Sequence, residues 1–437
     1  MVLLSGRLSL MSTHLRGTVK RLVAAIAWLC CLLLTGCGVM SSELALHASV
    51  VPNTITPNGD SLDDSASIRV QISRDAVITI ALSSETGRTH ILRAPTQLRA
   101  SSTPYTLSFD GIVESPGATA DCAGANMITR QLLPSGVYTW TVSASRRPET
   151  MPATAVTGTI TIADVDSSLP LICGLSVYPR VFTPNQDGID DRATVNLVAD
   201  RDVAALRVYL VGADGHTYDI PEVENLSRPG ERGFHTFDYD GGIDAGISPP
   251  ENGVYTLVAE ARDHYGQTAQ AFSSLEIRDA GLPRAYIANA EAEYSLSDVA
   301  IQETFCYSVT VTNESDTPLR TAGPWSGTAY GSGDNFNSLG WSEESGAFRV
   351  GLDYESSLRN YPYRWGLGTP GADLVQVGPY WYLPPHTQVV VTGCVRMDTE
   401  PVINPQHYWV GLIHEDVEIA AANDRVNPIL VTVRRGP

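Results

Sequence analysis

The stretch TPNGDSLDD at residues 56–64 recurs as TPNQDGIDD at residues 183–191, 127 positions further along the chain. Each copy is followed by alternating apolar and polar residues, and later by a second shared marker, SGVY at 135–138 and NGVY at 252–255. Alternation with a period of two predicts β-strands, and self-similarity at domain length indicates a duplicated module. The sequence therefore predicts two tandem all-β repeats.

Strands are expected at matching positions in the two repeats, separated by clusters of Ser, Asp, Gly and Pro that favour turns. Strands at this spacing, without a helical period, predict Ig-like β-sandwiches. In the first repeat the expected strands are 67–72, 77–83, 91–93, 105–109, 136–143 and 157–162, and in the second they are 194–198, 205–211, 217–220, 235–239, 253–261 and 269–277.

The repeats resemble a known module, the FlgD-type immunoglobulin-like domain. The resemblance rests on TPNxDxxxDD, on a later Asp-Gly pair (residues 110–111 and 240–241) and on the GVY marker. That family is found at the C-terminus of flagellar hook-capping proteins and is appended to secreted and surface proteins. The resemblance implies a β-sandwich that acts as a spacer or adaptor, and it names no ligand.

A third, different module follows the repeats. The segment FCYSVTVTN at 305–313 alternates cleanly and resembles the opening of Ig-like domains in bacterial surface proteins, and further strands are expected at 389–395, 408–414 and 429–434. The predicted fold class is all-β, with three tandem Ig-like β-sandwich domains after a lipoprotein signal peptide. The expected boundaries are 48–165 for domain 1, 166–280 for domain 2 and 281–437 for a Trp-rich domain 3.

The N-terminus carries the pattern of a signal peptide. Basic residues precede an apolar run at 22–34, which has the length of a signal h-region and is short for a membrane span. The run ends in LTGC, which resembles a bacterial lipobox and implies cleavage after residue 36 and lipidation of Cys37. The expected product is exported, attached to the cell envelope by its lipid, with residues 37–47 as a short tether. An ordinary signal containing a chance cysteine is the alternative, and either Met1 or Met11 fits the start.

Charge and composition exclude several classes of function. Without the expected signal the chain has 25 basic and 48 acidic residues, and a net charge of −23 repels nucleic acid. Lys20 is the single lysine and lies in the signal. P-loop, Schiff-base and SxxK chemistry all need a lysine, so the mature chain has none of these sites.

Four cysteines remain after the signal: Cys122, Cys173, Cys306 and Cys394. An even number in an exported chain predicts two disulfides. Cys306 and Cys394 share the third module and are expected to pair. Cys122, in a late loop of the first repeat, is expected to pair with Cys173 and to fix the boundary between the two repeats. Metal ligation is the alternative.

The two Asx-rich loops offer hard oxygen atoms at matching positions. Ca²⁺ prefers six to eight such ligands, so a structural Ca²⁺ in each loop is one interpretation. No glutamate follows to close either cage. The other interpretation is an Asx-turn network in which the side chains accept bonds from backbone N–H groups. The candidate ligands are Asn58, Asp60, Asp63 and Asp64 in the first copy and Asn185, Asp187, Asp190 and Asp191 in the second.

The third module holds five of the seven tryptophans. Those in turn-rich segments, Trp325 and Trp365, are candidates for stacking on a sugar ring. The alternative is that the tryptophans fill a sandwich core.

Catalytic and metal-binding patterns are weak in this chain. Local carboxylate pairs such as Glu343–Glu344 and Asp353–Glu355 are candidates for a glycosidase, but no other feature of the sequence supports their positions. The sequence favours a surface-loop interpretation for the cluster His407, His414, Glu415 and Asp416, because two histidines seven apart on a strand face opposite sides.

The predicted function is non-enzymatic. Two membrane-proximal repeats would act as a stalk, and the third domain would recognise a surface protein or an envelope glycan. The alternative is a scaffold or accessory subunit of an extracellular enzyme or of a surface-assembly or secretion complex.

Overall fold

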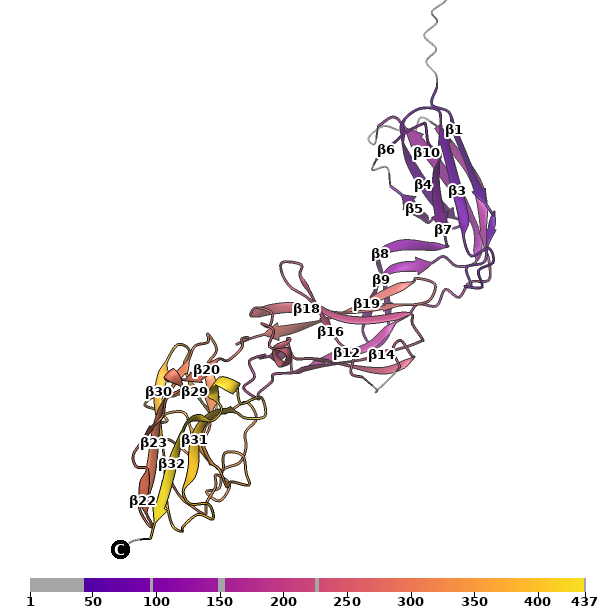
Figure 1. Cartoon of the computed structure of the whole chain (residues 1–437). Helices are drawn as coiled ribbons and strands as arrows, with labels where there is room; N and C mark the ends of the chain where they lie inside the picture. Colours follow the sequence, from indigo (N-terminus) through magenta and orange to yellow (C-terminus); the bar gives the residue numbers. More distant parts are fainter. Residues whose placement is uncertain (1–42, 95–96, 148–153, 225–227, 436–437) are drawn as a thin grey trace, which may run out of the picture. The chain divides into compact units, whose positions relative to one another are not determined.

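The computed structural model describes residues 43–94, 97–147, 154–224 and 228–435 (Figure 1). Their regular structure is β-strand with three short 3₁₀ helices, which confirms the all-β prediction. In these ranges no helix has the length and apolarity needed to cross a membrane. The chain forms two compact units. Of the described residues, the first unit contains those within 43–57, 62–110 and 135–163, and the second contains those within 58–61, 111–134 and 164–435.

The first repeat is a sandwich of two sheets, ordered β1-β3-β7 and β2-β11-β10-β4-β5, with β6 added beside β4. Its strands alternate between buried and exposed residues, so that Ile80 and Val142 lie fully buried between the sheets. Its strands are β1 (Leu46–Val51), β2 (Thr54–Ile55), β3 (Ala66–Ile72), β4 (Ala76–Ser84), β5 (Thr89–Arg93), β6 (Leu98–Arg99), β7 (Tyr105–Phe109), β10 (Gly136–Ser145) and β11 (Thr154–Ile162).

The second repeat has the same topology, with β12-β14-β17 in one sheet and β13, β19, β18, β15 and β16 in the other. In both repeats a two-residue strand joins the last long strand in parallel, β2 with β11 and β13 with β19. This equivalence supports the predicted duplication. The elements are β12 (Ile172–Tyr178), β13 (Val181–Phe182), β14 (Ala193–Ala199), β15 (Ala205–Val211), β16 (Thr217–Ile220), β17 (Gly233–Tyr239), η1 (Ile243–Ala245), β18 (Gly253–Arg262) and β19 (Thr268–Ile277).

One hairpin lies in the sequence of the first repeat but in the sheet of the second. Strands β8 (Ile112–Asp121) and β9 (Ala125–Leu132) fall between β7 and β10 along the chain, and β9 pairs with β19 (Figure 1). The hairpin was not among the predicted strands. The range 48–165 predicted for domain 1 therefore contains a segment that folds with domain 2.

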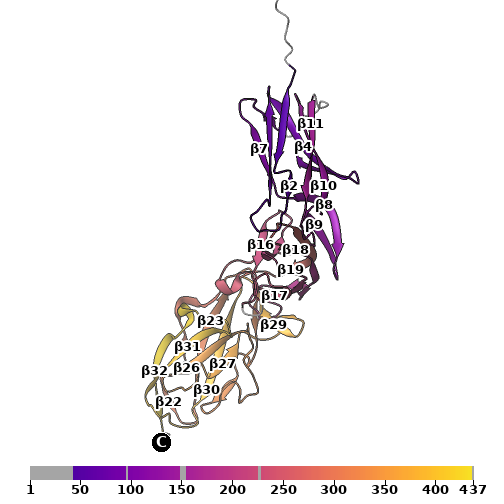
Figure 2. The ribbon, with the colours of Figure 1, turned by 90° about the vertical axis from the view of Figure 1, so that its right-hand side faces the viewer.

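The third domain has two sheets, β20-β23-β30-β25 and β22-β32-β31-β26-β24-β29-β28. Figure 2 labels strands of both sheets, among them β23 and β30 of the first and β31 and β32 of the second. Residues from both sheets, including Phe305, Val350 and Trp365, form one buried apolar cluster. The elements are β20 (Ala285–Ile287), η2 (Ala288–Ala290), β21 (Glu293–Tyr294), β22 (Asp298–Ala300), β23 (Thr304–Asn313), β24 (Leu319–Thr321), β25 (Ala329–Gly331), β26 (Phe348–Tyr354), β27 (Tyr363–Gly366), β28 (Val375–Val377), β29 (Tyr380–Leu383), β30 (Gln388–Arg396), β31 (Gln406–His414), η3 (Ala421–Asn423) and β32 (Val426–Arg434).

Candidate functional site

The expected lipidation site, Cys37, lies outside the described residues. Both predicted disulfides are present, Cys122–Cys173 and Cys306–Cys394. Structural disulfides form and persist in oxidising compartments, which indicates an extracellular or surface protein.

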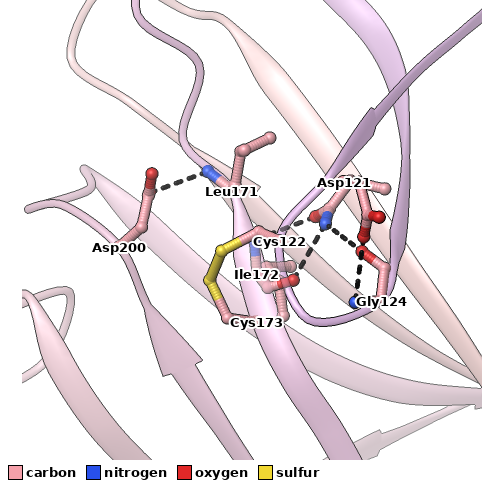
Figure 3. Close-up of a disulfide and its surroundings, with 8 residues drawn as sticks. Asp121, Cys122, Gly124, Leu171, Ile172, Cys173 and Asp200 are labelled. Atoms are coloured by element: carbon pink, nitrogen blue, oxygen red, sulfur yellow. Dashed lines mark hydrogen bonds between the residues drawn. A yellow bond between two sulfur atoms is a disulfide. The ribbon is translucent and has the colours of Figure 1, made fainter.

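The Cys122–Cys173 bond does not have the predicted position. Cys122 lies in the turn of the β8–β9 hairpin and Cys173 lies in β12, so the bond fastens the hairpin within the second unit (Figure 3). Next to it, the fully buried Asn126 amide donates to the Ile172 carbonyl at 2.9 Å and accepts from the Ile172 N–H at 2.9 Å. The expected link between the two repeats is therefore a clasp inside one of them.

The two Asx-rich loops have the same backbone geometry. The Thr56 N–H donates to the Asp63 carbonyl at 2.9 Å, and the Thr183 N–H donates to the Asp190 carbonyl at 3.0 Å. The side-chain oxygen of each loop asparagine accepts the N–H two residues later, at 3.0 Å in both copies. These are the bonds of an Asx turn, the alternative to a calcium loop.

Three positions in each loop have a positive φ, and the copies place their glycine differently. The values are 81°, 69° and 53° at Gly59, Ser61 and Asp63 in the first copy. The second copy has 57°, 79° and 52° at Gln186, Gly188 and Asp190. Because either of the first two positions can hold the glycine that this conformation favours, a difference in sequence leaves the loop shape unchanged.

The second loop lies buried against the third domain, within the same unit. The Tyr382 hydroxyl of β29 donates to Asp187 Oδ2 at 2.9 Å, and the Arg320 guanidinium donates to the Asp187 carbonyl at 2.9 Å. His414 Nε2, at the end of β31, lies 2.8 Å from the Gln186 carbonyl oxygen. Asp187 is 7% exposed, whereas the equivalent Asp60 is exposed. We call this contact region the junction.

Burial shifts the pKa values of two side chains of the junction in opposite directions. Burial, together with the charge of Asp191, raises the pKa of the Asp187 carboxyl to about 6. Burial lowers the pKa of His414 to about 4, against hydrogen bonds to backbone carbonyls that favour its charged form. His414 also stacks on Phe348, with ring centroids 4.0 Å apart. The junction therefore holds a neutral histidine next to a carboxyl that protonates readily.

The second loop fits a turn network better than a calcium cage. Asp187 Oδ1 accepts the Ile189 N–H at 2.9 Å, and the two Asp191 oxygens accept the N–H groups of Asn185 and Gly188 at 3.0 and 2.6 Å. The carboxylate oxygens proposed as ligands here thus accept hydrogen bonds already. Among the described residues, no group of three or more His, Cys, Asp or Glu is arranged to hold a metal. A carboxylate oxygen that accepts one hydrogen bond keeps a further lone pair. Calcium coordination therefore stays a prediction.

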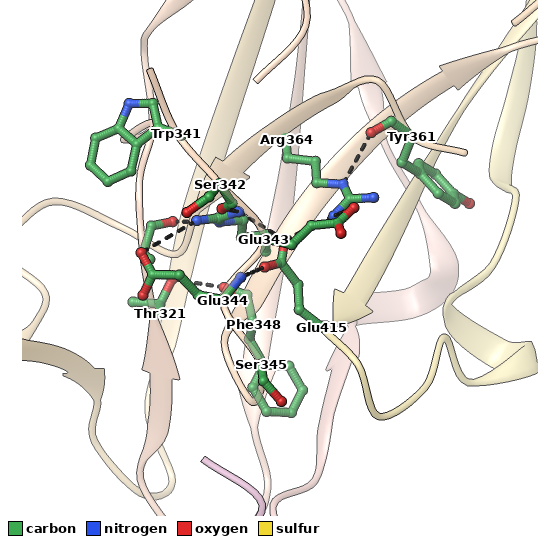
Figure 4. Close-up of polar contacts among 12 residues, drawn as sticks. Thr321, Trp341, Ser342, Glu343, Glu344, Ser345, Phe348, Tyr361, Arg364 and Glu415 are labelled. Atoms are coloured by element: carbon green, nitrogen blue, oxygen red, sulfur yellow. Dashed lines mark hydrogen bonds and ion pairs between the residues drawn. The ribbon is translucent and has the colours of Figure 1, made fainter. Parts of the chain in front are cut away.

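Three of the weak catalytic and metal candidates, Glu343, Glu344 and Glu415, belong to a network of ion pairs with arginines (Figure 4). Glu415 Oε1 lies 2.8 Å from Arg349 Nη1 and 3.0 Å from Arg364 Nη1. Glu344 pairs with Arg320 at 2.6 Å. The predicted surface loop was wrong for His414 and Glu415, because both are buried. His407 is exposed on the same strand, which confirms that the two histidines face opposite sides.

The second carboxylate pair is also held by structural contacts. The carboxylate of Asp353 accepts the Tyr354 N–H at 2.9 Å, and Glu355 lies 3.4 Å from His407. Asp353 is thus engaged by the backbone, and Glu355 lies in an exposed contact with a histidine.

The two tryptophans predicted to stack on a ligand differ in how deeply they are buried. Trp365 is 0% exposed and its indole N–H donates to the Thr328 carbonyl at 2.8 Å, so the prediction that it stacks on a ligand was wrong. It follows a turn-rich segment but lies on β27, whose residues are all buried. Trp325 is partly buried, packs against the core and meets Trp341 edge-on at 6.1 Å between centroids.

The end of the third domain opposite the junction exposes apolar side chains that the sequence did not single out. Strand β31 runs from Gln406 at this end to His414 at the junction, and two loops, 355–362 and 397–405, leave the sheet beside Gln406. Leu358 is 105% exposed and Val402 is 99% exposed, and Ile403 is also exposed. We call these three residues the apolar tip.

The loops that carry the apolar tip are fixed by their neighbours. The Ser356 hydroxyl donates to Gln406 Oε1 at 2.6 Å, and the Arg359 guanidinium lies over the Phe336 ring at 4.9 Å. Asn404 bonds to both the N–H and the carbonyl of Val433, at 2.9 and 2.7 Å. Apolar side chains held outward on braced loops lose little conformational entropy on binding, which favours association.

No protein-family model and no curated protein matches this chain. Solved structures that are similar to it include a Ca²⁺-stabilised adhesin with which an Antarctic bacterium binds ice, at 12% identity and a TM-score of 0.22, covering 90% of this chain and 74% of that one. Another is a tetra-tandem repeat from the extending region of a large adhesion protein, at 12% identity and a TM-score of 0.16, covering 84% and 81%. A third is a 1.5-MDa bacterial ice-binding adhesin, at 11% identity and a TM-score of 0.19, covering 90% and 99%. At these values the similarity assigns neither a family nor a ligand, and the FlgD-type resemblance stays a prediction.

Proposed function

We propose that this chain is a non-enzymatic, lipid-anchored surface protein whose third domain binds a partner protein through the apolar tip. The observation that carries the proposal is the full exposure of Leu358 and Val402 on braced loops at the end of the domain opposite the junction. Loops at one end of a β-sandwich are a common place for recognition, because the sheets hold them while their sequence varies.

The chemistry of the tip favours a protein over a glycan. Leu358, Val402 and Ile403 are aliphatic and match the apolar side chains of a protein surface. A sugar-binding platform needs flat aromatic faces, and Trp365 is buried while Trp325 packs against the core. The carboxylates considered for catalysis are paired with arginines or bonded to the backbone, which supports a binding role over hydrolysis.

Site-specific photocrosslinking in the full chain, expressed in its own cells, tests this function. A benzophenone side chain would replace Leu358 or Val402 in two variants, and Val390, which is 58% exposed on β30, in a control. We expect the two tip variants to form the same protein adduct and the control to form none. Adding Leu358→Ser to the Val402 variant should reduce the adduct. Equal labelling at all three positions, or no adduct at the tip, would exclude the apolar tip as the binding surface.

A further inference from the structure

The last long strand has an equivalent place in the two repeats. β11 pairs with β10 as β19 pairs with β18, and the parallel two-residue strand covers only Thr161–Ile162 of β11 and Glu276–Ile277 of β19. Superposing these registers sets Ala155 at the position of Gln270. The side of β11 that faces away from β10 thus corresponds to the side of β19 that faces away from β18.

In the second repeat this side of the strand is occupied. Strand β9 pairs antiparallel with β19, with Met127 opposite Gln270 and Asn126 opposite Ala271. Thr129 adds a side-chain bond to the Thr268 carbonyl at 3.4 Å, and the Leu132 N–H donates to Gln267 at 3.1 Å. This sheet therefore continues into a hairpin that lies in the sequence between two strands of the other repeat.

In the first repeat, the described residues supply no strand beyond β2 on this side of β11. The Thr161 N–H donates outward to the Asn53 carbonyl at 2.8 Å, and because backbone direction alternates, the N–H groups of Ala155 and Thr157 point to the same side. The stretch Thr154–Ile162 contains no charged residue and no proline. Edge strands are normally protected by lysine, proline or a bulge, so an unprotected, β-branched edge is suited to pairing.

We propose that the β11 edge, at Thr154–Gly158, binds a β-hairpin of a partner protein by antiparallel strand addition. The occupant is inferred from the chain itself, since the equivalent edge of the second repeat takes an antiparallel hairpin. Main-chain bonds supply the affinity in this mode of recognition. Ala155 takes the position of Gln270, which lies opposite Met127, and a strand that continues past the end of the β9 contact would also bond to Thr157. The edge carries no charge, so the incoming strand needs no complementary charge. The position equivalent to Cys173 is His47, so the contact has no covalent clasp and is reversible.

A cyclised, fluorescently labelled peptide carrying residues 111–134 with Cys122→Ser serves as the probe for this edge. Anisotropy would measure its binding to the full chain and to variants. Thr157→Pro removes the outward N–H while sparing the ladder to β10, and Thr157→Ala is the matched control that keeps the N–H. We expect saturable binding that weakens roughly tenfold or more with proline and is unchanged with alanine, since each lost backbone bond lowers affinity several-fold.

Other results would overturn the proposal. Absence of binding would do so, as would binding that Thr157→Pro leaves intact. Self-association of the chain that Thr157→Pro abolishes would assign the edge to a second copy instead of a hairpin partner. Ala155→Pro provides a second variant if Thr157→Pro fails to fold. Hydrogen exchange of the Thr157 amide in the unmodified chain should slow when the peptide is added, and this readout needs no variant.

Discussion

The first and second repeats have the same topology and the same Asx-rich turn. They differ in the burial of that turn and in the segment that connects to the strand beginning with the GVY marker. In the second repeat the turn is buried in the junction, with Asp187 bonded to Tyr382. In the first repeat the link from β7 to β10 is a hairpin that joins another sheet, whereas in the second the link from β17 to β18 contains only η1. The two copies of the fold thus differ in their contacts because of the Asx-rich loop and because of the segment that precedes β10 or β18.

The position of glycine follows from these contacts. A Cβ at Gly188 would overlap the Ser345 carbonyl oxygen, so the second copy needs its glycine there. Gln186 then fills the other left-handed position, where its side-chain amide donates to the Ile243 carbonyl at 3.0 Å. The first copy has Ser61 at the position of Gly188 and carries its glycine at Gly59. The different position of the glycine in the two loops is therefore explained by the contacts of the second loop in the junction.

Removing the Cys122–Cys173 disulfide with Cys122→Ser and Cys173→Ser should cause the largest difference in stability between the two repeats. The bond closes a separation of 51 residues, and its loss costs about 4 kcal/mol by chain entropy. Hydrogen exchange measured by mass spectrometry should show protection lost in β8, β9 and β12. Strands β3 and β10 should keep theirs, although the hairpin lies in the sequence of the first repeat. Equal loss in β3 and β10 would mean that the hairpin stabilises both repeats.

Substituting the glycines separates backbone strain from close packing. Gly188→Ala and Gly59→Ala both place a Cβ at φ near +80°, which costs about 1 kcal/mol each. A Cβ at Gly59 would have no heavy atom closer than 4.0 Å, whereas Gly188→Ala also forces the junction apart, so its total should reach about 3 kcal/mol. Denaturant unfolding would measure both. Equal losses would show that the junction yields without cost.

Local patterns in the sequence predicted the strands because alternation and turn residues act over short distances. The ranges 105–109, 205–211 and 217–220 match β7, β15 and β16 residue for residue. The sequence does not predict the β8–β9 hairpin as part of the second repeat, because its acceptor strand β19 lies more than a hundred residues later in the chain. Pairing over that distance depends on the assembled sheet, and no local residue pattern encodes it.

The candidate site was predictable in part for a similar reason. The even number of cysteines and their closeness in sequence predict the correct disulfide partners. The segments that the Cys122–Cys173 bond joins depend on the β8–β9 hairpin, which the sequence does not predict. Pro362 and its neighbours favour turns and predict a loop at Trp365, yet β27 begins at Tyr363. The apolar tip has no sequence signature, since exposed and buried leucines look alike until neighbouring strands define which side is solvent.

The smallest effect concerns pH, because the two shifted groups of the junction oppose each other. Between pH 6 and 4 the folded chain holds a proton on Asp187 that the unfolded chain releases, so acidification through this window stabilises the fold by about 3 kcal/mol. From pH 6.5 to 4 the unfolded chain protonates His414 while the folded chain does not, so acidification destabilises the fold by about the same amount. These two contributions should nearly cancel in the unmodified protein.

Single substitutions should reveal each contribution, measured as the free energy of unfolding at a series of pH values. Asp187→Asn keeps an acceptor for Tyr382 but removes the titration, so stability relative to the unmodified chain should fall as pH drops from 6 to 4. His414→Gln should make stability rise over the same window, because its side-chain amide can still donate to the Gln186 carbonyl. Asp191 and Arg320 face Asp187, and burial also raises the pKa of Asp191, so the Asp187→Asn profile includes the altered titration of Asp191. The double variant should restore the nearly flat profile. A double variant as steep as either single one would show that groups other than Asp187 and His414 set the pH dependence in this window, and it would contradict the prediction.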